Sequence, residues 1–480
     1  MTPLILIARE KWRLMRRNRV AVIALALVLL LSTIAAVTSV AQQAETAALR
    51  AHFQQEADAA FAAQPSRHPH RMVHFGQFAF KPVEPLAAFD PGVDPFTGTA
   101  IFLEGHRQNS ANFGDVRQSS LLVRFGQLTP AFVLQILAPL ILIFLGFGAV
   151  ARERDGGTLV QLRAHGMTIA ALLTGKAIAL GAIGGLILVP AGAALAWMVV
   201  VHGASLPAAT LLLASYTLYL AIWVGGVILA SAIMRQARSA LILLVGAWLT
   251  TAILVPRMAP DIAGAVQSLP TRLESEVAVT RDYRAIGDSH DPNDPHFAAF
   301  RTAVLKKYNV ARVEDLPVNY AGLLAVEGER LSAELFARYA DQLFAQEARQ
   351  SDIMNRFALV SPTAAIRQAS MALADTDRAA HRRFLGQAEA FRYDLVQRLN
   401  MLEATDVTAE NDAKGDDPAT ETLSRVSQDH WRSMPTFHPR PSGIETRAKG
   451  AGPALGYLVG WLLAIGACLL FAGRRMGNGR

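Results

Sequence analysis

Six long segments of this chain contain no Asp, Glu, Lys or Arg and are rich in Leu, Ile, Val and Ala. They cover residues 20–40, 128–150, 177–200, 208–233, 239–255 and 454–473. Each is about long enough to cross the hydrocarbon layer of a bilayer, which takes roughly 17–25 residues of α-helix. A backbone in lipid must satisfy its own hydrogen bonds, so these segments should be helical. The sequence therefore predicts a mainly α, polytopic membrane protein with six transmembrane helices.

The charges that flank these segments indicate the orientation. Basic residues gather before the first span, between the second and third, between the fourth and fifth, and after the sixth. They are Arg9, Lys11, Arg13, Arg16, Arg17, Arg19, Arg152, Arg154, Arg163, Lys176, Arg235, Arg238, Arg474, Arg475 and Arg480, and the acids there are Glu10, Glu153 and Asp155. The positive-inside rule then places both termini and these loops in the cytoplasm. We expect the protein to lie in a bacterial inner membrane.

Two other interpretations of the same features are weaker. The net charge of +7 does not indicate nucleic-acid binding, because the excess positive charge lies in the membrane flanks. Residues 39–41 resemble a signal-peptide cleavage site, but the apolar core before them is longer than that of a usual signal peptide. We therefore expect a retained first span.

The six spans divide the chain into five parts. They are 1–40, the N-terminal segment and first span; 41–127, a first extracytoplasmic insertion; 128–255, spans two to five with a cytoplasmic loop at 151–176; 256–453, a second extracytoplasmic insertion; and 454–480, the last span and tail. The insertions make up more than half of the chain, which is enough for a folded domain with its own core.

The two insertions differ in their predicted secondary structure. Residues 41–63 should continue the first span as a helix that ends before Pro65, and the Gly- and Pro-containing stretch beyond predicts short strands and turns. The second insertion should be mostly helical, with Ser361 and Asp377 as N-caps of two helices and Pro362 at the first helical position. Residues 404–450 have little periodicity and predict a linker or a partly ordered return to the membrane.

Catalytic motifs are not recognisable. There is no nucleophile elbow and no His-Glu-x-x-His helix. Thr174-Gly175-Lys176 resembles the end of a P-loop, but Ala177 and Ala170 occupy the positions of its hydroxyl residue and earlier glycine. We therefore expect a non-catalytic chain, and any ATP and Mg²⁺ would be bound by a separate subunit.

The first insertion contains the histidines His68, His70, His74 and His106, with Glu104 near the last of them. Metal binding by such a set is conceivable, but the spacing fits no strong zinc pattern, and surface or hydrogen-bonding histidines are far commoner. No metal ligand is predicted.

The interiors of the six spans contain no ionisable residue of the kind that proton- or sodium-coupled carriers use. This favours a protein whose energy comes from outside the bilayer. Pro139 and Pro190 lie inside the second and third spans, and each should free a carbonyl and kink its helix. Nothing polar marks a substrate pathway through the spans.

The loop at 151–176 is too polar to lie in lipid and too short to be a domain. It contains Arg152-Glu-Arg-Asp-Gly-Gly-Thr-Leu, preceded by Phe147-Gly and followed by Gly175-Lys. In this order these residues resemble the ABC-2-type permeases, the membrane subunits of ATP-binding-cassette exporters. Asp155 is a departure, because Glu is usual there. The resemblance extends, within a subgroup with large extracytoplasmic insertions, to Asp90-Pro-Gly-Val-Asp-Pro-Phe-Thr-Gly, Leu103-Glu-Gly-His-Arg-Gln-Asn, Phe125-Gly-Gln-Leu-Thr-Pro, Ser361-Pro, Asp375-Thr-Asp and the stretch from Phe384 to Arg392.

The resemblance implies a coupling helix that docks on a cytoplasmic ABC ATPase. Thr158 can cap a helix over 159–165 and Gly166 can end it, with Leu159 and Leu162 on one side. The implied coupling residues are Glu153, Arg154, Asp155, Gly157, Thr158, Leu159, Leu162 and Gly166. Implied partners are that ATPase, which would hold ATP and Mg²⁺, the lipid bilayer, and a second permease in a homodimer or a heterodimer. This chain would hold no cofactor.

Two further functions stay open at this point. The chain could transmit ATP-driven motion to a periplasmic partner without moving a substrate through its spans, and the large insertions favour this. It could also be an anchor or sensor without an ATPase, although six uncharged spans are excessive for an anchor.

Overall fold

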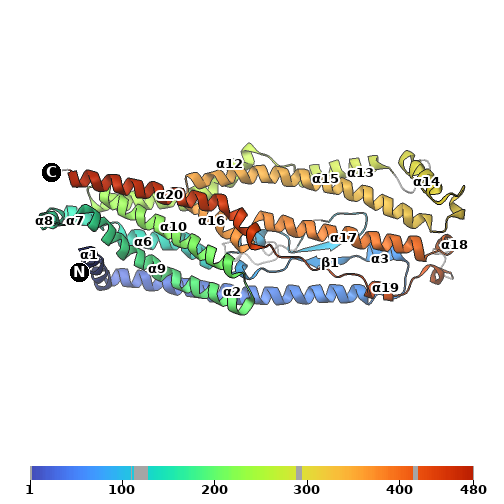
Figure 1. Ribbon diagram of the computed structural model, residues 1–480, viewed down its shortest axis with the longest axis horizontal. Coiled ribbons are helices and arrows are strands. Elements are labelled where there is room, and N and C mark those ends of the chain that lie inside the picture. Colours follow the sequence, from blue (N-terminus) through green and yellow to red (C-terminus); the bar gives the residue numbers. More distant parts are fainter. Residues whose placement is uncertain (1–2, 110, 113–127, 288–293, 414–419, 479–480) are drawn as a thin grey trace.

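The computed structural model describes residues 3–109, 111–112, 128–287, 294–413 and 420–478. The molecule is elongated, with both termini at one end, which we call the terminal end (Figure 1). A bundle of apolar helices forms the half next to the termini, and the insertions form the other half. Arg480 and the first part of the Phe125-Gly-Gln-Leu-Thr-Pro motif lie outside the described residues.

Six helical segments of the described chain are long and apolar enough to cross a membrane, as predicted. Four of these segments each consist of one long helix: α2 (Arg19–Ala62), α9 (Ile169–His202), α10 (Leu206–Ile233) and α20 (Ile444–Asn478). The other two segments each contain a π-helix. The segment Pro130–Asp155 is built from α5 (Pro130–Phe132), η4 (Val133–Leu137), α6 (Ala138–Gly146) and α7 (Ala151–Asp155), and the segment Ala237–Val266 from α11 (Ala237–Trp248), η5 (Leu249–Leu254) and α12 (Val255–Val266).

The first span is preceded by a helix of its own and continues far beyond the bundle. Helix α1 (Pro3–Arg17) packs on α9, and the Asn18 side chain then caps α2 by accepting hydrogen bonds from the backbone N–H groups of Val20 and Ala21. Helix α2 runs without a break along the insertion half (Figure 1). The prediction that residues 41–63 extend the first span is confirmed.

The first insertion contains the predicted short strands and turns. Its elements are α3 (Pro69–Phe75), β1 (Gln77–Phe80), η1 (Pro85–Ala88), η2 (Asp94–Phe96) and β2 (Ala100–Leu103). The two strands pair antiparallel, with Gln77 opposite Leu103 and Phe80 opposite Ala100. Ile101 and Leu103 are buried in a small apolar core that also contains Phe384 of the second insertion.

The second insertion is helical, as predicted. Its elements are α13 (Arg272–Ile286), α14 (Pro295–Tyr308), η6 (Val313–Asp315), α15 (Tyr320–Arg356), η7 (Phe357–Leu359), α16 (Pro362–Ala374), α17 (Arg378–Asp406), α18 (Ala409–Ala413), η8 (Glu421–Ser424) and α19 (Asp429–Arg432). Both predicted caps are confirmed. Ser361 accepts from the Ala364 N–H at 2.9 Å, and Asp377 accepts from the Ala380 N–H at 2.8 Å.

The described part of residues 404–450 is more ordered than the sequence predicts. Trp431 is 1% exposed and its indole N–H donates to the carbonyl of Pro65 at 3.1 Å, which ties this segment to the end of α2. Phe437 is buried against Phe384 and Phe391 of α17. The last helix begins at Ile444, earlier than the boundary at 454 that the loss of charge suggested. Of the two predicted alternatives, a linker or a partly ordered return to the membrane, the linker does not describe this segment, because these few aromatic anchors fix it in place without a periodic pattern.

The second insertion, predicted as residues 256–453, is not wholly separate from the bundle. The Ser361 hydroxyl donates to the Thr251 carbonyl of η5 at 2.5 Å, and the Trp461 indole of α20 donates to the Ala358 carbonyl at 3.0 Å. Thr251 and Trp461 both lie within candidate spans. Helix α15 therefore leads the chain into the bundle, and α16 returns it, packed against α10 and α20.

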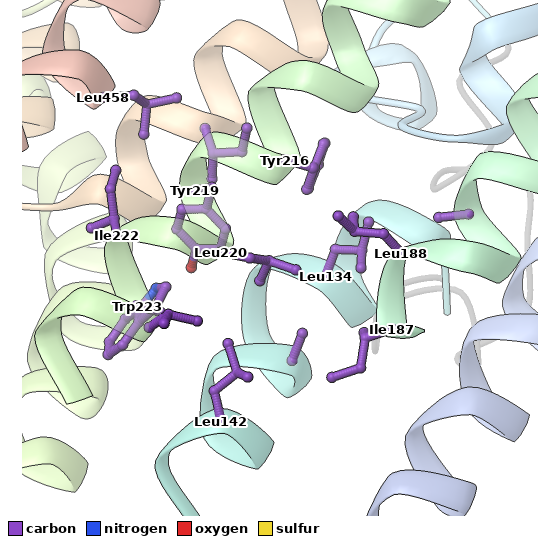
Figure 2. Close-up of a cluster of buried hydrophobic side chains, with 14 of the residues drawn as sticks. Leu134, Leu142, Ile187, Leu188, Tyr216, Tyr219, Leu220, Ile222, Trp223 and Leu458 are labelled. Carbon is purple, nitrogen blue, oxygen red and sulfur yellow. The ribbon is translucent and has the colours of Figure 1, made fainter. Parts of the chain in front are cut away.

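A buried polar network joins α16 to the spans. The Tyr219 hydroxyl of α10 donates to the Gln135 carbonyl at 2.7 Å and lies 2.9 Å from the Thr363 hydroxyl. Gln135 is four residues before Pro139, which has no N–H to use that carbonyl, so the predicted free carbonyl finds a side-chain donor. The Gln135 amide also donates to the Tyr216 hydroxyl at 2.7 Å. Figure 2 shows both tyrosines among the apolar side chains of the bundle.

The contact of α15 with α17 depends on a glycine. A Cβ at Gly322 would lie 2.3 Å from the Ala404 backbone nitrogen, which cannot move away without separating the helices. We expect Gly322→Ala to lower the free energy of unfolding of this helix pair by about 1–3 kcal/mol. Gly328→Ala on the same helix meets open space and should raise it by about 0.5–1 kcal/mol. Hydrogen exchange of the α15 and α17 amides measures both. Equal effects would show that the close approach is not needed.

Candidate functional site

Two short helices project at the terminal end of the bundle (Figure 1), and the predicted coupling residues lie in them or in the turns next to them. They are α7 and α8 (Thr158–Ala164). Gly157 joins them with a φ of 72°, and Gly166 ends the pair with a φ of 80°; both values lie in the left-handed region that favours glycine. The prediction that Gly166 ends this helix is confirmed. The prediction for Thr158 is corrected, because Gly157 is the N-cap and Thr158 is the first helical residue.

Glu153 links α7 to α8 and to α9. Its Oε1 lies 2.7 Å from the Nζ of Lys176 in α9, and its Oε2 accepts a hydrogen bond from the Thr158 hydroxyl at 2.5 Å. Lys176 is only 7% exposed and the Glu153 side chain 24%, so this ion pair is partly shielded from water and holds α9 against the start of α8. The Thr158 side chain thus stabilises the turn by reaching back to Glu153 rather than by capping.

The next two residues bind the loop between α10 and α11. The Arg154 guanidinium donates to the Met234 carbonyl at 2.6 Å and to the Ala232 carbonyl at 2.7 Å, at the C-terminus of α10. The Asp155 carboxylate accepts from the Ala237 N–H at 3.0 Å, at the N-terminus of α11. A cation at a helix C-terminus and an anion at an N-terminus are each favoured by the helix dipole. Arg154 and Asp155 therefore fasten α7 to two spans at once.

Helix α8 has one face against the bundle and one exposed face. Leu159 and Leu162 are half-buried and pack against the main apolar core, whereas Val160 is 72% exposed. The Arg163 guanidinium donates to the Gly477 carbonyl near the end of α20 at 3.0 Å. The two leucines do lie on one side, but it is the side that holds the helix to the bundle. The exposed residues of α8 include Val160, Gln161 and Ala164.

Sequence reasoning missed three of these contributors. Ser231 accepts hydrogen bonds from the N–H groups of Val150 and Ala151 at 2.9 and 3.1 Å, and so anchors the start of α7 on α10. Val160 and Arg163 supply the exposed face and the link to α20. The helical spacing of Val160 relative to Leu159 and Leu162 could have indicated that these residues face opposite sides.

Helix α1 lies beside this site. Its Lys11 is close to Lys176, Arg152 and Glu153, and burial followed by the two neighbouring cations lowers the pKa of the Lys11 amine to about 8. Ile5, Leu6 and Leu14 of α1 are exposed apolar residues, and Arg9, Arg13 and Arg16 are exposed basic ones. A helix of this composition is typical of a membrane–water interface.

The histidines singled out in the sequence lie in the insertion half, where three of the four come together. His70, His74 and His106 each present a ring nitrogen within 4.8 Å of the others. Glu104 is not part of this group, and its carboxylate accepts a hydrogen bond from the Asn109 amide at 3.0 Å. His68 instead caps α3 and lies 2.8 Å from Asp412. Burial, and then the neighbouring imidazoles, lower the pKa of His70 to about 4, so its ring is neutral at physiological pH.

The comparisons with known proteins bear on the second insertion alone. Residues 272–440 match a family model described as a domain of unknown function, DUF3526. The match runs from the start of α13 to beyond α19 and does not include α7 or α8. No curated protein matches the chain.

Proposed function

We propose that this chain is the membrane subunit of an ATP-binding-cassette transporter, with the ATPase on a separate polypeptide that docks on α7 and α8. One observation carries the proposal: this helix pair is bonded to α9, α10, α11 and α20, while the outer face of α8 is exposed. A push on α8 would therefore reach four spans through short hydrogen bonds and an ion pair. The resemblance of residues 147–176 to the ABC-2-type permeases supports the same assignment.

The charge distribution supports a cytoplasmic position for the terminal end. The basic residues that flank the spans gather there, on α1, α7, α8 and the α10–α11 loop. A cytoplasmic ATPase would approach the molecule from this side. In the proposed complex two membrane subunits pair, as two copies or with a sister permease, over two ATPase subunits that hold ATP and Mg²⁺. Export is the proposed direction, on the resemblance alone.

A second candidate function is mechanical transmission to a partner on the other side of the membrane. Two features favour it. Helix α2, which rises about 1.5 Å per residue, is a single continuous helix that runs through both halves. Helix α16 lies in the bundle and is fixed to the spans by hydrogen bonds of hydroxyl groups. Motion of the spans would then move the insertion half directly.

Vesicles that contain this chain and the ATPase would distinguish the two functions. If inside-out vesicles take up a labelled compound from an isotope-labelled cell extract only when ATP is present, the result supports transport. If ATP moves the insertion half and no compound is taken up, the result supports transmission.

The docking assignment is tested with Val160→Asp. Val160 is 72% exposed, so the change removes little packing within this chain and adds a charge to the surface that the ATPase would cover. We expect the recovery of a P-loop ATPase with the tagged chain from its native membranes, measured by quantitative mass spectrometry, to fall by about tenfold or more. The thermal midpoint of the chain itself should not change.

The control for this test is Leu423→Asp, which adds the same charge at an exposed leucine of the insertion half. It should leave the recovery of the ATPase unchanged. If the wild-type chain recovers no ATPase, the proposed function is wrong. If Val160→Asp and Leu423→Asp recover equal amounts, the ATPase binds elsewhere.

A further inference from the structure

Three imidazoles from separate elements converge in the insertion half. His70 and His74 are four residues apart on α3 and share one face, and their Nε2 atoms are 3.2 Å apart. His106 comes from the turn after β2, and its ring centre lies 5.6 Å from that of His70 and 5.4 Å from that of His74. Two ligands of one tetrahedral ion with metal–nitrogen distances of about 2.0–2.1 Å are about 3.3 Å apart. The distance of 3.2 Å between the His70 and His74 Nε2 atoms is close to this value.

The backbone around the cluster brings the His106 turn close to α3. The Gly105 N–H donates to the Val73 carbonyl at 3.1 Å, and a Cβ at Gly105 would lie 2.1 Å from a methyl of Val73, so the turn can pack here only with glycine. Helix α3 is itself fixed, because Met72 and Val73 are buried against α17. His106 adopts a φ of 62°, in the left-handed region that is uncommon for histidine. The convergence is therefore part of the folded core.

Buried carboxylates lie behind two of the three rings. The Nδ1 of His70 is 3.9 Å from the Oε2 of Glu403, which is 4% exposed and whose Oε2 has no hydrogen-bond partner in the described part of the chain. The Nδ1 of His106 is 3.7 Å from the Oε2 of Glu329, which is fully buried and paired with Arg392 at 2.6 Å. Metal-binding histidines usually direct the nitrogen that does not bind the metal toward such a carboxylate, which orients the ring.

We propose that His70, His74 and His106 form a binding site for a divalent first-row transition metal ion, with Zn²⁺ as its representative, through their Nε2 atoms. Glu403 and Glu329 orient the rings of His70 and His106. Three imidazoles suit zinc, copper and nickel and do not suit Ca²⁺ or Mg²⁺, which take oxygen ligands. Three protein ligands leave one position of a tetrahedral ion open.

The open position faces a cleft. His74 is exposed, and all three histidines line a cleft of about 2620 Å³ that also borders α13 and α15. An ion bound here can therefore exchange with the surroundings and take a fourth ligand from the cleft. His68 does not belong to the ligand set, since its Nδ1 accepts from the His70 N–H at 3.1 Å and its Nε2 is engaged by Asp412.

The test uses the full chain purified in mild detergent without a polyhistidine tag and stripped of metal with a chelator. Titration with ZnCl₂ by calorimetry should give one ion per chain, and CoCl₂ should give the visible absorption bands of tetrahedral Co²⁺. His74→Ala should weaken Zn²⁺ binding by about 100-fold or more and abolish the Co²⁺ bands. Glu403→Gln, behind His70, should weaken it by about 10–100-fold. Because His74 is exposed, its removal should leave the thermal midpoint of the metal-free chain unchanged.

Two controls isolate the site. His52→Ala removes an exposed histidine of α2, and His68→Asn keeps an N-cap acceptor for α3; both variants should bind one Zn²⁺ with wild-type affinity. If the wild-type chain binds no stoichiometric Zn²⁺, or if His74→Ala binds it as tightly as His52→Ala, the His70–His74 contact is an ordinary hydrogen bond and the proposal is wrong. Neither outcome depends on the ATPase.

Discussion

Replacing Arg392 by Met should lower the free energy of unfolding of the insertion half by about 3–5 kcal/mol. Arg392 of α17 is 2% exposed and its guanidinium donates to Glu329 of α15 at 2.6 Å, to Glu389 at 2.7 Å and to the Glu104 carbonyl at 3.1 Å. Methionine fills a similar volume but leaves Glu329, which is fully buried, without its counter-ion. The cost of an unpaired buried charge is what makes the effect large.

The matched control is Arg398→Met on the same helix. Arg398 and its partner Asp394 are both more than half exposed, so water screens the pair and its loss should cost less than about 1 kcal/mol. Hydrogen exchange of the α15 and α17 amides in detergent measures both variants. If Arg392→Met and Arg398→Met lower protection equally, Glu329 is not held by Arg392.

Replacing Arg154 by Met should leave the proposed ATPase bound but uncouple it from the insertion half. The guanidinium is the contact between α7 and the end of α10, and its loss leaves the carbonyls of Ala232 and Met234 without this donor. We expect the ATP-dependent change in hydrogen exchange of the α16 and α17 amides to fall by about fivefold or more, the scale of typical coupling energies. Recovery of the ATPase should stay at the wild-type level, since the exposed face of α8 is not altered.

Arg152→Met is the control for this variant. Arg152 lies on the same short helix, 4.9 Å over the Phe147 ring. The Arg152→Met variant should keep the wild-type ATP-dependent change in hydrogen exchange of the α16 and α17 amides. A wild-type response from Arg154→Met would show that force does not pass from α7 to α10, whereas loss of the ATPase itself would show that Arg154 belongs to the docking surface.

Some features of the molecule follow from short stretches of sequence. The six spans were predictable because lipid requires long uncharged helices, and this requirement acts on composition alone. The caps at Ser361 and Asp377 and the end of α8 at Gly166 were predictable because their hydrogen bonds and φ angles involve residues within a few positions. Aromatic anchors such as Trp431 were not, because its partner, Pro65, is far away in the chain.

The sequence alone determined the number of spans, the helical nature of the second insertion and the place of the loop at 151–176. Only the tertiary structure decided that α16 lies inside the bundle, that Arg154 and Asp155 form hydrogen bonds with the ends of α10 and α11, and that His106 lies beside His70 and His74. Helix α16 is too short to register as a span. What makes its burial possible is that Ser361 and Thr363 find partners on η5 and α10. Such satisfaction of polar groups by distant residues is a property of the packed fold and leaves no local pattern.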